Sequence, residues 1–275
     1  MSLIEVEGVS FSYSGKQVLT DVALRIEEGS FVAVLGQSGA GKTTLARILN
    51  ATLKPDRGSV SVCGIECNDK ASVFNARRNV GLVMQNPESQ IIGDTVEDDV
   101  AFVLENMGLG RDEMERRISS ALEATSLSGL RFRNPRELSG GQKQLLAIAG
   151  VLAMQCRCIV LDEALSMLDK RARTEILALL HKLNRETGLS VVMMTHKADD
   201  AVSADVIHLM EKGRIVKSGS PKDVLASEAS KQIVSQSFAC SLACELRKRG
   251  MEIPSDIVCE DDLFTYLSGE EGSDA

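Results

Sequence analysis

The sequence contains no tryptophan and only nine aromatic residues among 275, so a platform that stacks nucleic-acid bases is not expected. Long apolar runs are also missing. The longest, Leu145–Met154, has ten residues, whereas a bilayer-spanning helix needs roughly 18. The first eight residues hold two glutamates and no basic residue, so no signal peptide is expected and the chain should stay where it is made.

An excess of positive charge is absent as well, since 31 Lys and Arg face 39 Asp and Glu, for a net charge of −8. Residues 251–275 hold eight acidic residues and no basic one, which leaves residues 1–250 neutral. A neutral body with an acidic end is poorly suited to coating a polyanion, so we expect no nucleic-acid partner. The acidic tip is expected to be a solvated tail, with a partner-contact surface as the alternative.

Metal-binding cysteine patterns are missing too. The seven cysteines are an odd number, and none of the close pairs Cys63/Cys67, Cys156/Cys158 and Cys240/Cys244 is a CxxC. Reduced thiols are therefore expected, and a structural metal site is not. Cys156 and Cys158 flank an apolar strand, where cysteine acts as a small apolar residue.

The N-terminal third predicts strands followed by a βα unit. Leu3–Tyr13 and Val22–Ile26 alternate apolar and polar residues, with Lys16-Gln17 placed in a turn between them. The apolar run Phe31–Leu35 precedes a glycine-rich stretch and the helical pattern Thr43–Asn50. An apolar strand, a glycine loop and a helix in this order indicate a parallel strand that is buried on both faces.

Two further apolar strands are expected at Cys158–Leu161 and Val191–Met194, with a helix at Arg171–Arg185 between them. Residues 96–130 and 142–154 are mainly helical in pattern, which predicts a helical subdomain inserted into an α/β core.

A strand pair, Val206–Met210 and Arg214–Lys217, is expected near the end, followed from about residue 222 by a helical, then acidic, appendage. The predicted architecture is an α/β core with an N-terminal antiparallel β-subdomain, an inserted helical subdomain and a small C-terminal helical appendage. We place the main domain at residues 1–225, its helical part at about 88–155, and the appendage at 226–275.

A phosphate-binding loop is the strongest motif. Residues 36–43 fit G-x-x-x-x-G-K-[ST] and lie between a strand and a helix, as this motif requires. Glycines allow successive N–H groups to turn inward around an anion, and the helix N-terminus adds positive potential. Lys42 is expected to reach the outer phosphates and the Thr43 hydroxyl to bind Mg²⁺. The nucleotide-binding residues of this loop are predicted to be Gly36, Gln37, Ser38, Gly39, Ala40, Gly41, Lys42 and Thr43.

A second anion-binding segment precedes the helix predicted at Gln142–Met154. Ser139 can cap this helix, and Gly140 and Gly141 can expose N–H groups. A plain helix cap is an equally good interpretation of this segment. Two phosphate cradles on one chain raise the possibility that the second serves a nucleotide held by another subunit, which would make the working unit a dimer.

The strand Cys158–Leu161 runs into two carboxylates, Asp162 and Glu163, which should lie beside the phosphate loop at the carboxyl edge of the sheet. Asp162 is expected to hold Mg²⁺, and Glu163 to orient and polarise the attacking water. A solvated acidic turn is the alternative, and the neighbouring phosphate loop makes it unlikely.

Two polar residues follow other strands. His196 could contact the γ-phosphate, or it could simply cap a helix or lie on the surface, as we expect for His181 and His208. Gln85 precedes Asn-Pro at a strand end and is a candidate link between the Mg²⁺ and water site and whatever the helical insert contacts.

Together and in this order, these features resemble the ATP-binding-cassette (ABC) ATPases over residues 3 to about 225. The resemblance implies a P-loop NTPase core, ATP and Mg²⁺ as ligands, and a head-to-tail dimer in which each Walker A loop faces the other chain's signature. It assigns catalysis to Glu163, His196, Gln85 and Lys42, and Mg²⁺ binding to Thr43, Gln85 and Asp162. It adds nucleotide contacts at Tyr13, which would stack on adenine, Thr44, the signature residues Ser139, Gly140, Gly141 and Gln142, and the D-loop residue Asp169.

The flanking segments 85–90, 95–102 and 147–155 are similar to one subfamily, the ATPases of energy-coupling-factor (ECF) transporters, as is the tail at 242–257. The D-loop Ser166–Asp169 is typical of the first of their two unequal ATPase subunits. This resemblance implies pairing with a second ATPase, peripherally at the cytoplasmic face of a prokaryotic cell membrane. The pair would drive uptake of vitamins or metal ions through a membrane T-component and S-components.

Few positions depart from the family pattern: Leu145 replaces an arginine, Ala164-Leu165 a commoner dipeptide, and Lys170 a proline, for which only small effects on the helix start are expected. A cassette protein acting on DNA or ribosomes is disfavoured by the short spacing between the two phosphate motifs and by the single cassette. A non-hydrolysing regulatory subunit would be expected to lack Glu163 or His196.

Overall fold

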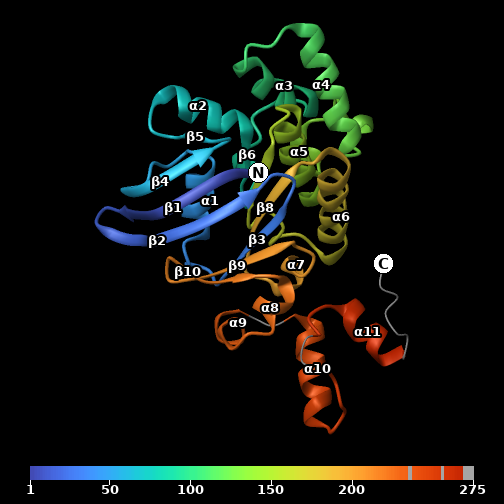
Figure 1. The fold of residues 1–275 in the computed structure, drawn as a ribbon. Coiled ribbons are helices and arrows are strands. Elements are labelled where there is room, and N and C mark those ends of the chain that lie inside the picture. Colours follow the sequence, from blue (N-terminus) through green and yellow to red (C-terminus); the bar gives the residue numbers. More distant parts are fainter. Residues whose placement is uncertain (235–236, 255–256, 269–275) are drawn as a thin grey trace.

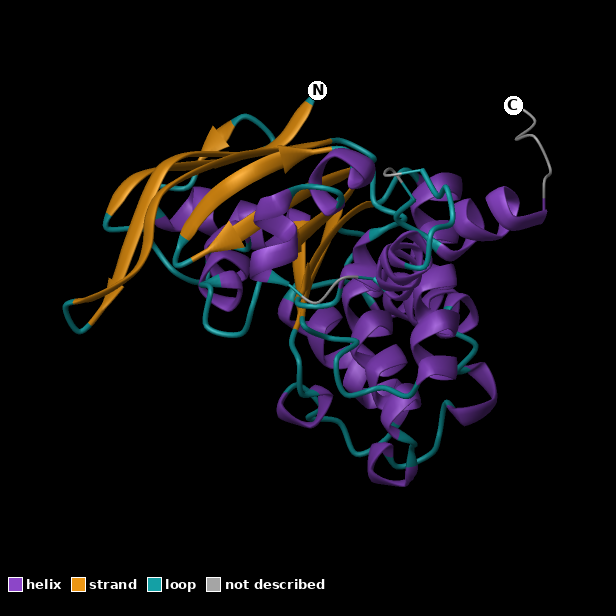
Figure 2. Cartoon of the chain, turned by 90° about the horizontal axis from the view of Figure 1, so that it is seen from below, coloured by secondary structure: helices purple, strands orange, loops and turns teal. Residues whose placement is uncertain are grey.

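The computed structural model describes residues 1–234, 237–254 and 257–268. Two sheets stack at one end of the molecule, and helices gather at the other (Figures 1 and 2). Part of the acidic tip, including residues 269–275, lies outside the described residues.

The N-terminal sheet is antiparallel, with strand order β2-β1-β4-β5. Its strands are β1 (Ser2–Tyr13), β2 (Lys16–Glu27), β4 (Arg57–Val62) and β5 (Ile65–Glu66). The expected turn at Lys16-Gln17 is wrong, because Tyr13 already pairs with Lys16 and the chain reverses at Ser14-Gly15. Both turn residues have positive φ, 47° and 83°, the backbone that a tight two-residue hairpin requires.

The second sheet has six strands in the order β10-β9-β3-β8-β7-β6, all parallel except β10. They are β3 (Phe31–Leu35), β6 (Val80–Val83), β7 (Cys158–Asp162), β8 (Ser190–Thr195), β9 (Val206–Glu211) and β10 (Arg214–Gly219). The strands predicted for this sheet are confirmed within about one to two residues, and the α/β class is confirmed, whereas β2 of the N-terminal sheet begins six residues before the predicted Val22.

Both faces of the parallel strands are buried, which explains their unbroken apolar runs. In β3, Phe31, Ala33 and Leu35 pack in one core cluster, and Val32 and Val34 pack in a second one. The strands β7 and β8 alternate in the same way between the two clusters. The cysteines next to and within β7 are buried among these apolar residues, as expected.

The helical insert lies between β6 and β7. It contains α3 (Val96–Asn106), α4 (Arg111–Ala124), α5 (Gly140–Ala153) and three short 3₁₀ helices at Pro87–Ser89, Ser128–Leu130 and Pro135–Glu137. The insert has an apolar cluster of its own, which includes Val100, Ile118 and Leu122. Arg131 ties the insert together, because its guanidinium donates to both oxygens of Glu97, at 2.7 and 2.8 Å, and to Glu115.

The remaining helices are α1 (Lys42–Leu49), α2 (Lys70–Asn79), α6 (Lys170–Thr187), α7 (Ala198–Ala201), α8 (Pro221–Leu225), α9 (Glu228–Ile233), α10 (Phe238–Lys248) and α11 (Glu260–Ser268). The last two project from the body beyond α8 (Figure 1) and share a small core around Ala243, Ile253 and Leu263. The division at residue 225 stays a prediction. Within the described ranges, no helix has both the length and the apolarity that crossing a bilayer requires.

Candidate nucleotide-binding site

The phosphate loop connects β3 to α1 at the carboxyl edge of the six-stranded sheet. The N–H of Gly36 donates to the carbonyl of Thr195 in β8 at 3.1 Å, which anchors the loop to the sheet. A Cβ at Gly36 would lie 2.4 Å from the carbonyl oxygen of Met210, so this close approach requires glycine. Gly41, with φ of 107°, precedes α1 and supplies no side-chain cap, which leaves the first-turn N–H groups available to an anion.

The Lys42 ammonium group lies inside this loop. Its Nζ donates to the carbonyls of Gly36 and Gln37, at 2.8 Å each, and is 3.0 Å from Oε1 of Glu163. Only 2% of the Lys42 side chain is exposed, against 15% for Glu163. The strongest positive charge of the loop is therefore paired with the carboxylate that follows β7.

Thr43 and Asp162 form the oxygen-rich part of the site. The Thr43 hydroxyl donates to Oδ1 of Asp162 at 2.9 Å. Burial raises the pKa of Asp162, partly offset by the hydrogen bond from Thr43. A hydroxyl beside a carboxylate is the donor set that Mg²⁺ prefers, and a bound cation would favour the ionised carboxylate. The residues present therefore fit this ion. Thr44, the next residue of α1, is buried.

Glu163 adopts left-handed backbone, with φ of 49°, an uncommon conformation for a residue with a side chain. Its N–H donates to the carbonyl of Met194 at 3.1 Å, so the turn after β7 is held against β8. This turn directs Oε1 toward Lys42 and places Oε2 3.6 Å from Nδ1 of His196. The structure thus brings the predicted residues from the ends of β3, β7 and β8 together.

Gln85 lies just beyond β6, as expected. Its Nε2 donates to the hydroxyl of Ser166 at 3.2 Å, which joins the segment around Gln85, here called the Q-loop, to the D-loop. The contact that the structure describes is with Ser166 and not with Thr43 or Asp162, so a role in Mg²⁺ binding stays a prediction.

The signature segment forms a capped helix start. The Ser139 hydroxyl accepts from the N–H of Gln142 at 3.3 Å, and Oε1 of Gln142 accepts from the N–H of Ser139 at 2.9 Å. The start predicted at Gln142 is wrong, because this reciprocal capping box places Gly140 and Gly141 inside the first turn of α5. The cap interpretation of Ser139 is confirmed, and its contact with a phosphate stays a prediction.

Two residues assigned by resemblance have structural contacts of their own. Tyr13 ends β1 with 42% of its surface exposed, and its ring meets that of Phe11 edge-on, with centroids 4.8 Å apart. Asp169 caps α6 by accepting from the N–H of Ala172 at 2.8 Å. This cap starts the helix at Lys170, so the missing proline does not displace the start, as expected.

The other histidines depart from the surface positions expected for them. His208 is buried in β9, where burial lowers its pKa to about 4. His181 is half-buried and stacks on Phe31, with ring centroids 4.1 Å apart. Both environments depend on distant segments, since β9 lies between β10 and β3 in the sheet and His181 of α6 packs on Phe31 of β3, and the local sequence gives little sign of either.

Sequence reasoning also missed residues beside His196, namely Thr195, Asp200 and Arg173. Asp200 follows His196 by four residues, about one helical turn, and this spacing was the available signal. Thr195 Oγ1 donates to Oδ2 of Asp200 at 2.9 Å, and Oδ1 of Asp200 lies 3.2 Å from Nη1 of Arg173.

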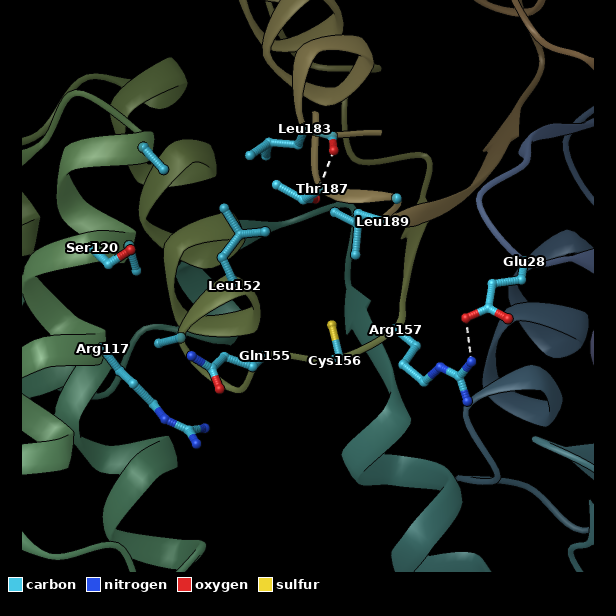
Figure 3. Close-up of a pocket in the computed structure, with 14 residues that line it drawn as sticks. Glu28, Arg117, Ser120, Leu152, Gln155, Cys156, Arg157, Leu183, Thr187 and Leu189 are labelled. Carbon is cyan, nitrogen blue, oxygen red and sulfur yellow. Dashed lines mark hydrogen bonds and ion pairs between the residues drawn. The ribbon is translucent and has the colours of Figure 1, made fainter. Parts of the chain in front are cut away.

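A cavity of about 440 Å³ lies elsewhere, at the amino ends of β7 and β8 (Figure 3). Figure 3 shows Cys156 and Gln155 between Arg117 and Arg157, with Glu28 paired to Arg157. In a parallel sheet, the amino ends lie on the edge opposite to the phosphate loop, so this cavity is separate from the nucleotide site.

The fold, with the phosphate loop at the carboxyl edge of the six-stranded sheet, defines a P-loop ATPase of the ABC class. Comparisons with known proteins agree. The ABC transporter family matches residues 19–166. The energy-coupling factor transporter ATP-binding protein EcfA1 of Enterococcus faecalis is 41% identical over 270 residues, and EcfA1 of Symbiobacterium thermophilum is 43% identical over 275. Each match covers 96% of this chain and 96% of the relative.

Solved structures give the same result. CbiO1 from Clostridium perfringens, part of the ABC transporter complex cbiONQ, aligns with a TM-score of 0.78 and 31% identity over 90% of this chain and 97% of its own. The ATP-binding cassette MJ0796, in a post-hydrolysis dimer bound to ADP and Pi, aligns with a TM-score of 0.72 and 29% identity over 79% of this chain and 98% of its own. The chain therefore belongs to the ABC transporter family and, within it, to the energy-coupling factor transporter ATP-binding proteins.

Proposed function

We propose that this chain is the ATPase motor subunit of an ECF-type importer, which takes up vitamins or transition-metal ions through a membrane T-component and its S-components. The observation that carries the proposal is the extent of the match. The alignment with the EcfA1 relative of Enterococcus faecalis, at 41% identity, covers 96% of the chain, far beyond the residues 19–166 that match the ABC transporter family model, and so includes most of the C-terminal appendage.

Nucleotide binding rests on the phosphate loop. The inward N–H groups of residues 36–43 and the start of α1 bind the phosphates. The Lys42 ammonium group leaves Glu163 and binds the outer phosphates instead. Tyr13 offers an exposed ring to the adenine. Thr43 and Asp162 would hold Mg²⁺, with Gln85 as a further predicted ligand, and the ion would supply charge neutralisation on the phosphates.

Hydrolysis rests on Glu163 and His196. Once Lys42 has turned to the phosphates, Glu163 is free to accept a proton from the attacking water and to orient it. His196, 3.6 Å from Glu163, is the proposed contact of the γ-phosphate. Catalysis is mainly positioning and charge stabilisation, as expected for phosphoryl transfer.

The site is completed by a second ATPase subunit. The capped start of α5 presents Gly140 without any neighbouring atom within 4 Å of an added Cβ, so a phosphate can approach it from outside the chain. In a head-to-tail dimer, Ser139, Gly140, Gly141 and Gln142 contact the nucleotide bound to the partner, as does Asp169. The partner is a second cassette or a second copy of this chain, and the appendage contributes to the pairing.

A hollow near the Q-loop fits the membrane partner. It measures about 540 Å³, and Glu88, Ile92, Asp94, Arg136 and Lys143 lie along it. The Ile92 side chain is 65% exposed there, an apolar contact within a polar rim. Gln85, three residues before Glu88, donates to Ser166 of the D-loop, and this bond is the proposed route by which closure of the dimer reaches the T-component. The chain acts peripherally at the cytoplasmic face of the membrane.

Co-purification tests the proposal. The chain is tagged at its N-terminus, native membranes are extracted in mild detergent, and the eluted proteins are identified. We expect a small polytopic membrane protein and a second cassette ATPase. We also expect S-components, whose identities would indicate the transported solutes. Recovery only from the soluble fraction, alone or with ribosomes or DNA, would overturn the importer assignment.

A further inference from the structure

A buried network outside the phosphate loop joins α6 to the turn that carries His196. Asp200, in α7, lies at its centre with 4% of its side chain exposed. One carboxylate oxygen is 3.2 Å from Nη1 of Arg173, and the other accepts from the Thr195 hydroxyl at 2.9 Å. A buried carboxylate with both oxygens partnered is held in a single orientation.

The Thr195 hydroxyl connects the residues before and after His196. Its Oγ1 also accepts from the N–H of Lys197 at 3.0 Å, so the residues on either side of His196 share one oxygen. Because the hydroxyl hydrogen points to Asp200, the lone pairs of this oxygen are directed at Lys197. Asp200 thereby fixes the turn from Thr195 to Lys197, and with it the direction of the imidazole.

The imidazole has little else to hold it. Nδ1 of His196 is buried and has no hydrogen-bond partner among the described residues, since the 3.6 Å to Glu163 is too long for a hydrogen bond. A cavity of about 10 Å³ is lined by Glu163, Ser166, Thr195, His196 and Asp200, so the network borders the reacting groups directly.

The other end of the network reaches the D-loop. The N–H of Arg173 donates to the carbonyl of Asp169 at 3.1 Å, in the first turn of α6. One ion pair, Arg173–Asp200, therefore links the start of α6 to the turn that carries His196.

We propose that Asp200 and Arg173 are positioning residues for ATP hydrolysis, which act by holding the Thr195–Lys197 turn so that His196 faces Glu163. The inference rests on the proposed roles of Glu163 and His196. It assigns no contact with nucleotide to either positioning residue, so they affect turnover and not nucleotide affinity.

The test measures phosphate release and ATP affinity for variants of the full chain in its detergent-extracted complex. We expect Asp200→Asn and Thr195→Val each to lower kcat at least tenfold, because small misplacements of a catalytic group are costly, with the Kd for ATP unchanged within threefold. Thr195→Ser keeps the hydroxyl and should restore most of the activity. Asp205→Asn is the matched control, since its carboxylate accepts from the N–H of Phe31 at the opposite edge of the same sheet.

A double-mutant cycle decides whether Asp200 acts through His196. We expect Asp200→Asn to add less than a twofold loss when His196 is already alanine. If the losses in kcat of Asp200→Asn and His196→Ala multiply in the double variant, the inference is overturned. It is also overturned if the kcat of Asp200→Asn alone lies within twofold of the parent. If His196→Ala itself leaves turnover intact, the proposed role of His196 fails instead. If Asp200→Asn does not fold, the same cycle with His196→Ala is measured with Thr195→Val.

Discussion

With Lys42 binding the outer phosphates as proposed, its ion pair with Glu163 should oppose nucleotide binding, and replacing Glu163 by glutamine tests this directly. Lys42 is 3.0 Å from Glu163, and both side chains are largely buried, so solvent screens the pair weakly. Lys42 has to leave this partner to reach a phosphate. Any substitution that weakens the pair therefore favours the nucleotide-bound state.

The size of the effect follows from the kind of hydrogen bond that changes. Glutamine keeps a neutral acceptor next to Lys42 but loses the charge. A hydrogen bond to a charged group contributes about 1.5–3 kcal/mol and a neutral one about 0.5–1.5 kcal/mol. The difference, about 1.4 kcal/mol, is a tenfold change in an equilibrium constant. We expect Glu163→Gln to bind ATP about tenfold more tightly while turnover falls at least a hundredfold, the scale of general-base catalysis.

Titration calorimetry with ATP and Mg²⁺ measures the affinity, and phosphate release by the detergent-extracted complex measures turnover. Glu175→Gln is the matched control, because it removes the carboxylate of an exposed pair with Arg171, and neither quantity should change. Unchanged or weaker ATP binding by Glu163→Gln would refute the competition between Glu163 and phosphate. Turnover within a few-fold of the parent would refute the role of Glu163 in hydrolysis.

Three further outcomes are expected. Gly36→Ala should lower ATP affinity more than tenfold, since its Cβ would meet a backbone oxygen of β9 at 2.4 Å; Gly110→Ala, with open space around it, is the calorimetric control. Burial lowers the pKa of His208 from 6.5 to about 4, so the unfolded chain takes up a proton first. The free energy of unfolding should then drop by about 3 kcal/mol as pH falls from 6.5 to 4, and His208→Gln should remove most of this dependence in urea titrations. Arg131→Gln should lower the free energy of unfolding by about 1–2 kcal/mol, because it loses the bonds to two carboxylates, whereas Arg171→Gln, at an exposed pair, should not change it measurably. Equal losses by thermal unfolding would contradict the argument.

Sequence patterns located the phosphate loop, the parallel strands and the edge at which Asp162, Glu163 and His196 lie. They succeed because each feature depends on a short segment: a glycine loop, an apolar run, a polar residue at a strand end. Partnerships between segments could not be predicted. The pairing of Lys42 with Glu163 and the burial of His208 depend on how distant strands and helices pack.

The start of α5 shows the same limit on a smaller scale. Two glycines are poor helix formers, yet both lie in the first turn of α5. The reciprocal bonds of Ser139 and Gln142 outweigh this preference, and they were visible in the sequence only as a serine followed three residues later by a glutamine.

The double-sided core of the six-stranded sheet also affects how faithfully the chain can fold. A strand displaced by one residue turns each side chain to the other face, and here the other face is apolar too. Apolar burial alone therefore discriminates poorly between aligned and slipped strands. Alignment depends instead on contacts that need a particular side chain, such as Thr43 with Asp162 at the carboxyl edge and the Phe31 N–H with Asp205 at the amino end of β3. Polar side chains at both ends of the strands thus select the correct alignment, and those at one end also belong to the nucleotide site.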